Sequence, residues 1–381
     1  MTSVSPSPLK TLCQNVFSFF VEDISNGKET LQIPCLNWVD TRSVPPFNYV
    51  KDCCLDSGVS METDNGFMIR CGCSDQCSLS HCSCRQLTED EGQGLTRPNK
   101  SNITDGYDNS NRLMSKLVSG LYECNKYCQC SSSCGNRVIQ NGIKHKLMVF
   151  KTKDIGWGVL TLEDIPQGSF VCSYVGLIMN DEIANRTGLD FGDNYLAELD
   201  YIEVLEYAKE CDGGISGTSS SEGSLVLSSS SNSDSDTSNQ ISTTGSNMSC
   251  SPLLNEDNDL IDEDGHYLVS LSSNTPQSGL SSYSIPLTRS FFNESHSYVI
   301  DASSYGNVAR FINHSCSPNL FVQNVFVDSH DIRFPSVAFF AQSLIPAYSQ
   351  LFWDYNYIIG SVEGKAVKCM CGSSNCRGRL I

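Results

Sequence analysis

The sequence has no long apolar run and few basic residues. No stretch of about 18 apolar residues occurs in the 381-residue chain, so we expect no membrane-spanning helix. The first 24 residues lack the basic stretch, apolar core and cleavage site of a secretory signal peptide. Lysine and arginine total 25 against 43 acidic residues, a net charge of −18. This balance argues against coating nucleic acid through phosphate contacts. It suits solubility, or a basic partner such as a Lys/Arg-rich protein tail.

Twenty cysteines are present, and without a secretory signal their tight C-x-C spacing indicates metal binding rather than disulfides. Three tetrahedral ions in a ring need twelve bonds, which six terminal and three bridging thiolates can supply. Zinc is the metal expected for all-thiolate sites, and Cys130 is one candidate for a bridging position. The nine expected ligands, in two clusters, are Cys71, Cys73, Cys77, Cys82, Cys84, Cys124, Cys128, Cys130 and Cys134.

Short strand-like runs follow the cysteine clusters. KLMVFKT, GVLTLEDI, SFVCSYVGLIM and NYLAELDYI are rich in β-branched and aromatic residues, with Gly or Pro between them. The pattern stops near Cys211 and resumes at SYVID, residues 297–301. The Ser-rich and acidic tract between them cannot bury enough apolar surface to offset its ordering entropy, so we expect a disordered insertion in one β domain. The polar segment 88–111 is expected to be a surface loop.

Four short motifs carry the residue types of a binding site. GWGV at residues 156–159 lets backbone approach a ligand closely, although alone it also fits a tight hairpin. RFINHSC begins at residue 310, and alone its histidine could be a hydrogen-bonded core residue. DYNY follows an apolar run and places Tyr355 at a strand end, and CMCGSSNC at residues 369–376 adds three more thiols.

Taken together and in this order, the motifs resemble the SET-domain lysine methyltransferases. The resemblance covers roughly residues 25–210 and 291–381. It implies a mostly β fold, the β-clip SET fold with a pseudoknot, flanked by zinc-cluster pre-SET and post-SET modules. The split core and strings such as YECNKYCQC and CRGRLI resemble the SET-domain-bifurcated, or Eggless, branch. Members of that branch usually carry Tudor and methyl-CpG-binding domains upstream, and neither is recognisable here.

The resemblance implies a fixed order of segments along the chain. These are a disordered tail (1–30), a pre-SET module with the three-zinc cluster (31–137), the SET N-terminal half (146–210), the disordered insertion (211–290), the SET C-terminal half (291–358) and a post-SET zinc segment (366–381).

The resemblance also implies roles for single residues. Tyr355 matches the tyrosine beside the transferring methyl, and Trp353 matches the position that controls how many methyls fit. Tyr174 and Tyr195 match aromatic positions around the lysine channel. The residues implied at the S-adenosylmethionine pocket are Gly156, Trp157, Gly158, Arg310, Asn313 and His314. The ligands implied for a fourth zinc are Cys316, Cys369, Cys371 and Cys376. The cysteines expected to be structural or free are Cys13, Cys35, Cys53, Cys54, Cys172, Cys211 and Cys250.

The chemistry of methyl transfer to lysine suits these residue types. The attacking amine must be neutral, and a narrow, dry, aromatic channel beside a cationic cofactor lowers its pKa. Trp353 has no hydroxyl to anchor a water in the space of a third methyl, so it should permit trimethylation. Two positions depart from the family pattern, because Tyr348 stands where Gly is expected and Gln350 where Glu is expected. A left-handed turn at Tyr348 would cost roughly 1 kcal/mol or more and could reduce activity.

The resemblance to the Eggless branch therefore implies a nuclear, chromatin-bound methyltransferase that trimethylates lysine 9 of histone H3 in heterochromatin and gene silencing. The expected partners are the histone H3 tail and heterochromatin and corepressor proteins. Neither a membrane nor sequence-specific nucleic-acid binding is expected. Two alternatives stay open: a SET-family enzyme acting on a non-histone protein, and a low-activity chromatin scaffold.

Overall fold

A computed structural model describes most of the chain after residue 18. The described residues are 19–62, 68–74, 76–77, 82–93, 106–191, 195–212, 253–254, 260–261, 287–292, 296–357, 359 and 366–381. The beginning of the expected tail and most of the expected insertion therefore lie outside the described residues. Among the helices in these ranges, none has both the length and the apolar character that a membrane crossing requires.

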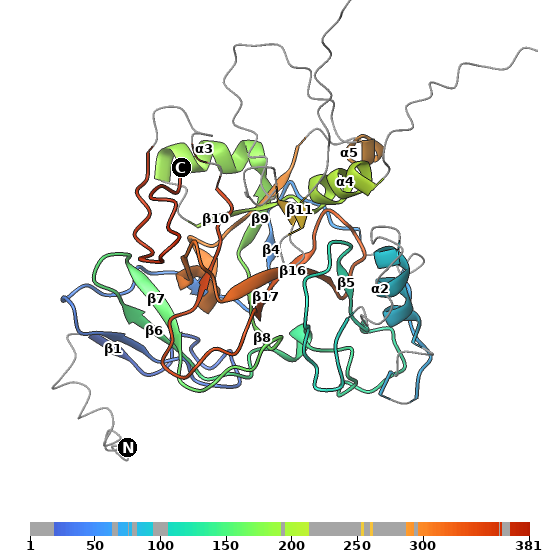
Figure 1. Ribbon diagram of the computed structural model, residues 1–381, viewed down its shortest axis with the longest axis horizontal. Coiled ribbons are helices and arrows are strands. Elements are labelled where there is room, and N and C mark those ends of the chain that lie inside the picture. Colours follow the sequence, from blue (N-terminus) through green and yellow to red (C-terminus); the bar gives the residue numbers. More distant parts are fainter. Residues whose placement is uncertain are drawn as a thin grey trace, which may run out of the picture.

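The first sheet gathers strands from the N-terminal half of the chain. Its order is β1 (Phe19–Val21), β2 (Cys35–Asn37), β6 (Leu147–Lys151) and β7 (Trp157–Thr161). β2 and β6 run parallel, and the other neighbours run antiparallel. In Figure 1 this sheet occupies the lower left of the molecule.

The expected disordered tail at residues 1–30 is wrong for its described part. β1 pairs with β2, and the turn after β1 is organised by Asp23. The Asp23 carboxylate accepts backbone N–H bonds from Ser25 at 3.0 Å and Gly27 at 2.8 Å. This is local turn chemistry, which a search for apolar periodicity does not detect.

The second sheet joins the two sides of the insertion. Its order is β10 (Leu196–Leu199), β13 (Tyr298–Asp301), β9 (Leu177–Asn180) and β4 (Cys54–Leu55). β10 precedes the insertion and β13 follows it, and the two pair antiparallel from Leu196 opposite Asp301 to Leu199 opposite Tyr298. The prediction of one β domain split by an insertion is therefore confirmed.

The third sheet holds the cysteine-rich segment at one edge. Its order is β5 (Leu121–Tyr122), β16 (Leu320–Phe326), β17 (Ser336–Ala341) and β8 (Phe170–Tyr174). β5 lies between the two cysteine clusters in sequence and pairs parallel with β16. Side chains from the three sheets, such as Val149, Ile300 and Phe339, form one buried core. The predicted mostly β fold is confirmed.

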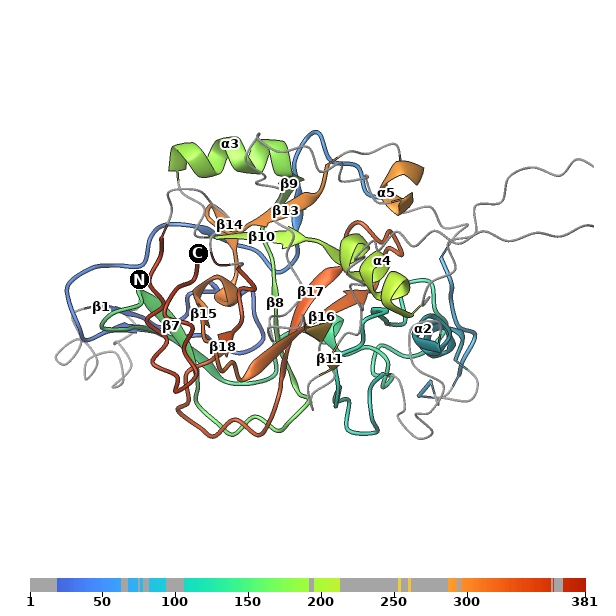
Figure 2. The same cartoon turned by 45° about the horizontal axis from the view of Figure 1, so that its top comes forward.

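Short strand pairs complete the β structure. They are β3 (Asn48–Tyr49) with β14 (Tyr305–Gly306), β15 (Asn313–His314) with β18 (Phe352–Trp353), and β11 (Leu253–Leu254) with β12 (Leu260–Ile261). β15 and β18 run parallel near the centre of Figure 2. The segment before β18 bonds to β7, because the N–H of Leu351 donates to the carbonyl of Val159 at 2.8 Å. The C-terminal strand is thus placed beside both the GWGV and the RFINHSC motifs.

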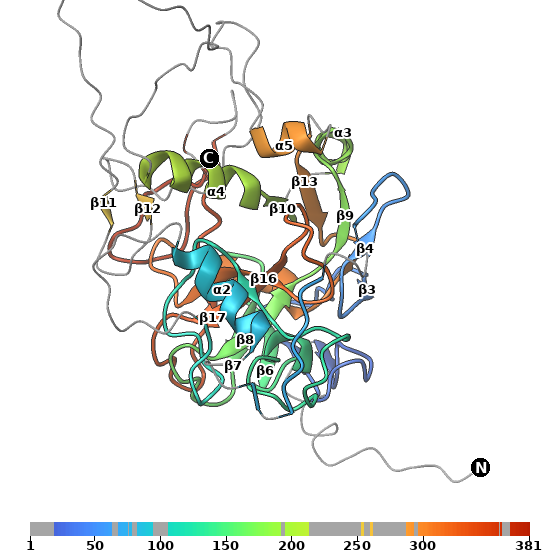
Figure 3. The same ribbon diagram turned by 90° about the vertical axis from the view of Figure 1, so that its right-hand side faces the viewer.

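Helices cover the sheets at their edges, as Figure 3 shows for α2 and α4. The helices are α2 (Ser83–Gln93), α3 (Asp181–Phe191), α4 (Tyr201–Asp212) and α5 (Leu287–Phe291), with 3₁₀-helices η1 (Ile139–Asn141) and η2 (Val308–Phe311).

Helix α2 corrects the expectation of a surface loop at residues 88–111 for its first part, residues 88–93, whereas residues 94–105 lie outside the described residues. The helix includes Thr88, which is fully buried and whose hydroxyl accepts the N–H of Tyr122 at 3.0 Å. Tyr107, at the other end of the segment, is also buried. A polar composition does not predict such buried contacts, because each contact is made with a different part of the chain.

Helix α4 begins where the sequence pattern predicted a continuing strand. Tyr201, Ile202, Leu205 and Ala208 are all buried, and their spacing is that of one helix face. The Tyr201 hydroxyl donates to the carbonyl of Ser119 at 2.5 Å. The β-rich run NYLAELDYI ends at Ile202, whereas the helical spacing of apolar residues continues to Leu205 and Ala208. The run alone therefore did not predict the helix.

Candidate active site and metal centres

The nine cysteines of the two N-terminal clusters lie together in one group, and seven of them are buried. The Sγ atoms of Cys71 and Cys77 are 3.7 Å apart, and those of Cys71 and Cys124 are 3.8 Å apart. Sulfurs in a disulfide are about 2.05 Å apart, whereas thiolates sharing a tetrahedral zinc with bonds of about 2.3 Å are about 3.8 Å apart. The spacing therefore fits metal ligands and not disulfides.

Three overlapping sets of four cysteines bring their Sγ atoms within 4.8 Å of one another. Cys71 belongs to all three sets, Cys77, Cys82 and Cys124 each belong to two, and Cys130 belongs to one. A bridging thiolate must serve two ions. The geometry therefore favours Cys71 over the expected Cys130 as a bridging ligand.

Protein N–H groups point at these sulfurs. The Asn136 side chain donates to Cys124 Sγ at 3.6 Å, and Arg137 donates to Cys130 Sγ at 3.5 Å. Such donors compensate the charge of thiolates and orient them as ligands. The residues around the cluster are thus suited to ionised cysteines.

A buried carboxylate joins the cysteine module to the β domain. Glu123 is fully buried, and its Oε1 accepts bonds from the Tyr107 hydroxyl at 2.7 Å and from the N–H groups of Val138 and Ile139 at 2.8 Å. Its Oε2 accepts a bond from Gln140 at 2.8 Å. Glu123 thus holds η1 against the strand that pairs with β16.

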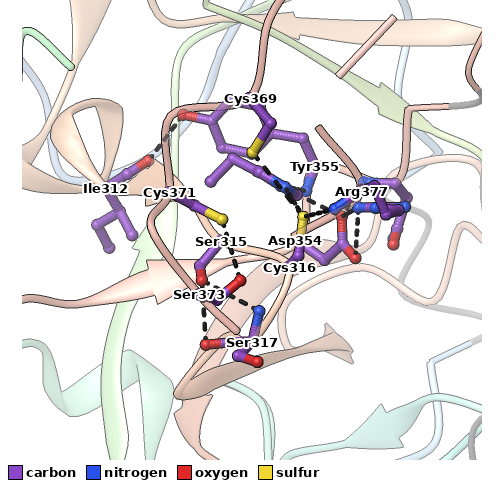
Figure 4. Close-up of polar contacts among 12 residues, drawn as sticks. Ile312, Ser315, Cys316, Ser317, Asp354, Tyr355, Cys369, Cys371, Ser373 and Arg377 are labelled. Carbon is purple, nitrogen blue, oxygen red and sulfur yellow. Dashed lines mark hydrogen bonds and ion pairs between the residues drawn. The ribbon is translucent and has the colours of Figure 1, made fainter. Parts of the chain in front are cut away.

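Cys316, Cys369, Cys371 and Cys376 form a second thiol cluster, with all four Sγ atoms within 4.8 Å of one another. Cys316 follows β15, whereas the other three lie in the C-terminal segment. The Sγ atoms of Cys316 and Cys369 are 3.8 Å apart, again the separation expected around zinc. Figure 4 shows how this cluster brings the C-terminal segment beside Tyr355.

His314 lies between this cluster and Tyr355. Its Nε2 is 3.3 Å from Cys316 Sγ, and its Nδ1 is 3.2 Å from the backbone nitrogen of Tyr355. Nδ1 is also 3.3 Å from the Asp354 carboxylate. Burial opposes the charged ring, but the bonds to Asp354 and Cys316 outweigh it and raise the pKa of His314. The imidazole is therefore held from both sides.

An aromatic cluster surrounds Tyr355. Its ring centroid is 5.1 Å from that of Trp353, which is 6.1 Å from that of Tyr174. The Tyr355 hydroxyl donates to the carbonyl of Ile312 at 3.0 Å, and the Tyr174 hydroxyl donates to that of Tyr195 at 2.8 Å. Burial raises the pKa of Tyr355 and Tyr174 above the usual range, so both hydroxyls stay protonated at neutral pH.

The GWGV motif lies next to this cluster. Asn313 donates a side-chain hydrogen bond to the carbonyl of Trp157 at 2.8 Å. Gly156 has a φ of 79°, in the left-handed region. A Cβ added at Gly158 would lie 2.7 Å from the side-chain nitrogen of Gln350. The backbone conformation therefore favours glycine at position 156, and a side chain at position 158 would force the flexible end of Gln350 to move.

Arg310 is held mainly by protein groups. Its guanidinium donates to the carbonyls of Ala302 at 2.8 Å and Ser303 at 3.0 Å. It also lies between the rings of Phe47 and Tyr195, 4.4 and 4.2 Å from their centroids. Arg310 therefore positions Tyr195, a role that the motif match did not reveal.

Three buried donors around these motifs have no partner among the described residues. They are Arg310 Nη1, Gln350 Nε2 and Trp353 Nε1. Buried donors in proteins normally have an acceptor, so each of these three could serve an acceptor of a bound molecule. S-adenosylmethionine carries carboxylate, ribose and adenine acceptors and is compatible with such donors.

Tyr348 adopts the left-handed conformation expected for its turn, with a φ of 64°. Its side chain is 75% exposed, and its N–H donates to the carbonyl of Thr161 at 2.7 Å. The turn therefore forms despite a strain of about 1 kcal/mol.

The motif match missed Asp354 and Arg377. Asp354 lies between Trp353 and Tyr355 in sequence, and Arg377 Nη2 contacts its two carboxylate oxygens at 2.7 and 2.9 Å. The sequence offered one indication of this pair. Charged residues stand inside two motifs, FWDYNY and CRGRLI. The other residues expected at the site are all brought into this region or into one of the two thiol clusters.

The split β core, the GWGV strand beside the RFINHSC motif and the two thiol clusters define a SET-fold protein with pre-SET and post-SET segments. The SET domain model matches residues 156–356, and the Pre-SET motif model matches residues 25–137. The chain belongs to the SET-domain family.

Its relatives by sequence are named as histone-lysine N-methyltransferases. The chain is 39% identical to eggless of Drosophila melanogaster over 94% of this chain and 29% of that protein. It is 36% identical to met-2 of Caenorhabditis elegans over 95% of this chain and 29% of that protein. The chain thus spans under a third of the length of these relatives.

Solved structures share the fold. SUVH6 of Arabidopsis thaliana in complex with SAM has a TM-score of 0.60 and 30% identity, covering 94% of this chain and 55% of that one. KRYPTONITE in complex with DNA, an H3(1-15) peptide and SAH has a TM-score of 0.58 and 26% identity, covering 95% and 54%.

Proposed function

We propose that this chain is an S-adenosylmethionine-dependent protein-lysine N-methyltransferase that trimethylates lysine 9 of histone H3. The observation that carries the proposal is the run of contacts from Tyr174 through Trp353 to Tyr355, beside Asn313 bonded to the carbonyl of Trp157. This arrangement places an aromatic wall directly next to a glycine-flanked strand and a set of unpartnered donors.

The cofactor, when bound, supplies an electrophilic methyl on a sulfonium. The residues proposed to hold it are Gly156, Trp157, Gly158, Arg310, Asn313 and His314. The aromatic side chains would exclude water from the target lysine, and desolvation lowers the pKa of its amine. The protonated hydroxyl of Tyr355 would orient the amine rather than remove its proton. Alignment and exclusion of water then supply the rate enhancement without a strong general base.

The degree of methylation is proposed from Trp353. An indole offers no hydroxyl that could hold a water in the space of a third methyl. The faces of the aromatic cluster can also hold the cationic, methylated amine. We therefore propose trimethyl-lysine as the final product.

A basic substrate fits the charge of the chain, which is −18 overall. Curated relatives are named as histone-lysine methyltransferases, and one neighbouring structure contains an H3(1-15) peptide. We propose the histone H3 tail as substrate and chromatin in the nucleus as the location. Heterochromatin and corepressor proteins are the proposed partners, and silencing is the proposed outcome.

The thiol clusters are proposed to hold four zinc ions. Three would sit in the nine-cysteine cluster, because six terminal and three bridging thiolates supply the twelve bonds of three tetrahedral ions, and the nine cysteines lie in one group. One would be bound by the Cys316 cluster, whose four sulfurs form a single set. Both would act structurally, since each site is closed by four protein ligands.

Methyl transfer from radiolabelled S-adenosylmethionine to a core-histone mixture tests the proposal. We expect label on histone H3, and none on an H3 tail peptide in which arginine replaces lysine 9. Label on another protein in a nuclear extract, with none on histones, would support the non-histone alternative. Cofactor binding without transfer to any protein would support the scaffold alternative. Either result would contradict the proposal.

A further inference from the structure

Arg377 follows the last cysteine of the C-terminal cluster and makes two distinct kinds of contact. Its backbone N–H donates to Cys316 Sγ at 3.4 Å. Its side chain also bonds Cys316, and Nη2 contacts both carboxylate oxygens of Asp354 at 2.7 and 2.9 Å. Figure 4 shows this pair beside Cys316.

Asp354 transmits this contact to the candidate active site. It lies directly before Tyr355, and its Oδ1 is 3.3 Å from His314 Nδ1. The same carboxylate accepts the N–H of Asn356 at 2.9 Å, which fixes the turn after Tyr355. The Asp354 and Arg377 side chains are 12% and 24% exposed, so water screens the pair only partly.

We propose that Arg377 is a positioning residue for the methyl-transfer reaction. By holding Asp354, it docks the C-terminal cysteine segment on the strand end that carries Tyr355 and fixes the His314 ring and the Tyr355 backbone. Arg377 itself touches neither substrate nor reacting atoms. This inference rests on the proposed methyltransferase function.

Arg377 is needed for positioning because the metal cluster alone does not fix the backbone around Tyr355. Four thiolates fix the C-terminal segment to Cys316, but they do not fix the turn from Asp354 to Asn356. A charge-assisted bond in a partly buried site is stronger than a neutral one and sets orientation. Displacement of a reacting group by about 1 Å can cost about 100-fold in rate, so loss of this bond should act on turnover.

Arg377→Gln tests the proposal, because it removes the charge and keeps the backbone N–H bond to Cys316. The matched control is Arg379→Gln, two residues later, where the side chain bonds the carbonyl of Ile381 at 3.0 Å. We expect Arg377→Gln to bind as much zinc as the wild type and to lower kcat at least about tenfold. KM for an H3 tail peptide should change less than about threefold, since the residue does not touch substrate. Arg379→Gln should behave as the wild type.

A double-mutant cycle with Asp354→Asn separates positioning from general damage. If the two residues act through one another, the double variant should be no slower than the slower single variant. Additive losses, a wild-type kcat in Arg377→Gln, or loss of zinc in parallel with kcat would overturn the proposal.

Fluorescence provides a readout that does not depend on activity. The chain has three tryptophans, and Trp353 precedes Asp354 directly. We expect a change in tryptophan emission in Arg377→Gln that is absent in Arg379→Gln and in a Trp353→Phe background. If the wild type proves inactive, the proposed function fails, and this emission test still decides whether Arg377 positions the strand end. Identical spectra in both variants would overturn the positioning role.

Discussion

At the scale of single residues, function and stability depend on a few polar groups in apolar surroundings. Glu123 is an example, because one carboxylate accepts bonds from Tyr107, Val138, Ile139 and Gln140. Without it, the Tyr107 hydroxyl and the N–H groups of Val138 and Ile139 would lose their acceptor in a buried site. One side chain thus secures the junction between the cysteine module and the third sheet.

Glu123→Gln should destabilise the protein by about 1–3 kcal/mol, because an amide N–H₂ would face at least one of these donors. The measurement is the denaturant midpoint in the presence of zinc. The control is Glu163→Gln at a half-exposed site beside His145, which should change stability by less than about 0.5 kcal/mol. Equal midpoints for Glu123→Gln and the wild type would refute the role assigned to this junction.

The sequence identified residues whose type and motif are distinctive. The metal-ligand cysteines of the two N-terminal clusters were predicted from their spacing, and the GWGV glycines, His314 and Tyr355 from the resemblance to the SET family. The structure brings each set together. Asp354 and Arg377 were not predicted, because an acidic and a basic residue in polar strings usually face solvent. Their pairing depends on a contact between segments 23 residues apart.

At the scale of elements, the strands were predictable and several helices were not. β-branched runs with Gly or Pro between them marked β6, β7 and β8. The start of α4 was hidden, because its first turn continues a β-rich string. The beginning of α2 lies in the cysteine cluster, and its polar continuation resembles a loop. Both helices are stabilised by contacts with segments distant in sequence, and local sequence patterns do not predict such contacts.

The two ends of the insertion are joined by a buried ion pair between α4 and α5. Arg289 Nε bonds the carboxylate of Glu203, and the Thr288 N–H donates to Glu206 at 2.6 Å. Arg289→Met should leave Glu203 unpaired and destabilise the protein by about 3 kcal/mol. Thermal unfolding with zinc present measures this, and the double variant with Glu203→Leu should recover part of the loss. A single variant as stable as the wild type would show that the ends meet without this pair.

The insertion between these helices should be dispensable for folding. The expected boundary at residues 211–290 is narrowed by the structure, because α4 ends at Asp212 and α5 begins at Leu287. We predict that a short Gly/Ser linker in place of residues 213–286 leaves a soluble protein that binds S-adenosylhomocysteine, since loop-closure cost depends weakly on length. Calorimetric titration checks this. Failure of the shortened protein to fold would mean that the replaced segment is structural.

At the scale of the whole molecule, two cysteine clusters suited to zinc lie on either side of a domain interrupted by a long insertion. The nine-cysteine cluster lies against the third sheet through β5, and the Cys316 cluster holds the C-terminal segment over the candidate site. Metal-binding free energy is folding free energy in such modules. Chelation should therefore unfold the cysteine module and release the C-terminal segment.

Metal analysis of the purified protein should give four zinc ions per chain. Cys71→Ser should lose more than one zinc, because Cys71 belongs to three overlapping sets, whereas Cys54→Ser should retain all four. A wild-type content of one or two zincs would contradict the cluster assignment. Loss of only one zinc in Cys71→Ser would remove it as a bridging ligand.

The central claim is that Tyr355 and Trp353 form the site of lysine methylation. Tyr355→Phe removes one hydroxyl and its bond to the carbonyl of Ile312, so fold and cofactor binding should persist. Turnover should fall about 100-fold or more, because the amine loses its alignment. Trp353→Tyr should keep turnover but stop at mono- or dimethyl-lysine, because a phenol can hold a water in the space of the third methyl.

Mass spectrometry of a histone H3 tail peptide, after incubation with S-adenosylmethionine and each protein, tests this claim most directly. The account predicts trimethyl-lysine at position 9 with the wild type, almost no product with Tyr355→Phe, and mono- or dimethyl-lysine with Trp353→Tyr. Wild-type rates from Tyr355→Phe, or unchanged trimethylation by Trp353→Tyr, would contradict it and place the reaction elsewhere.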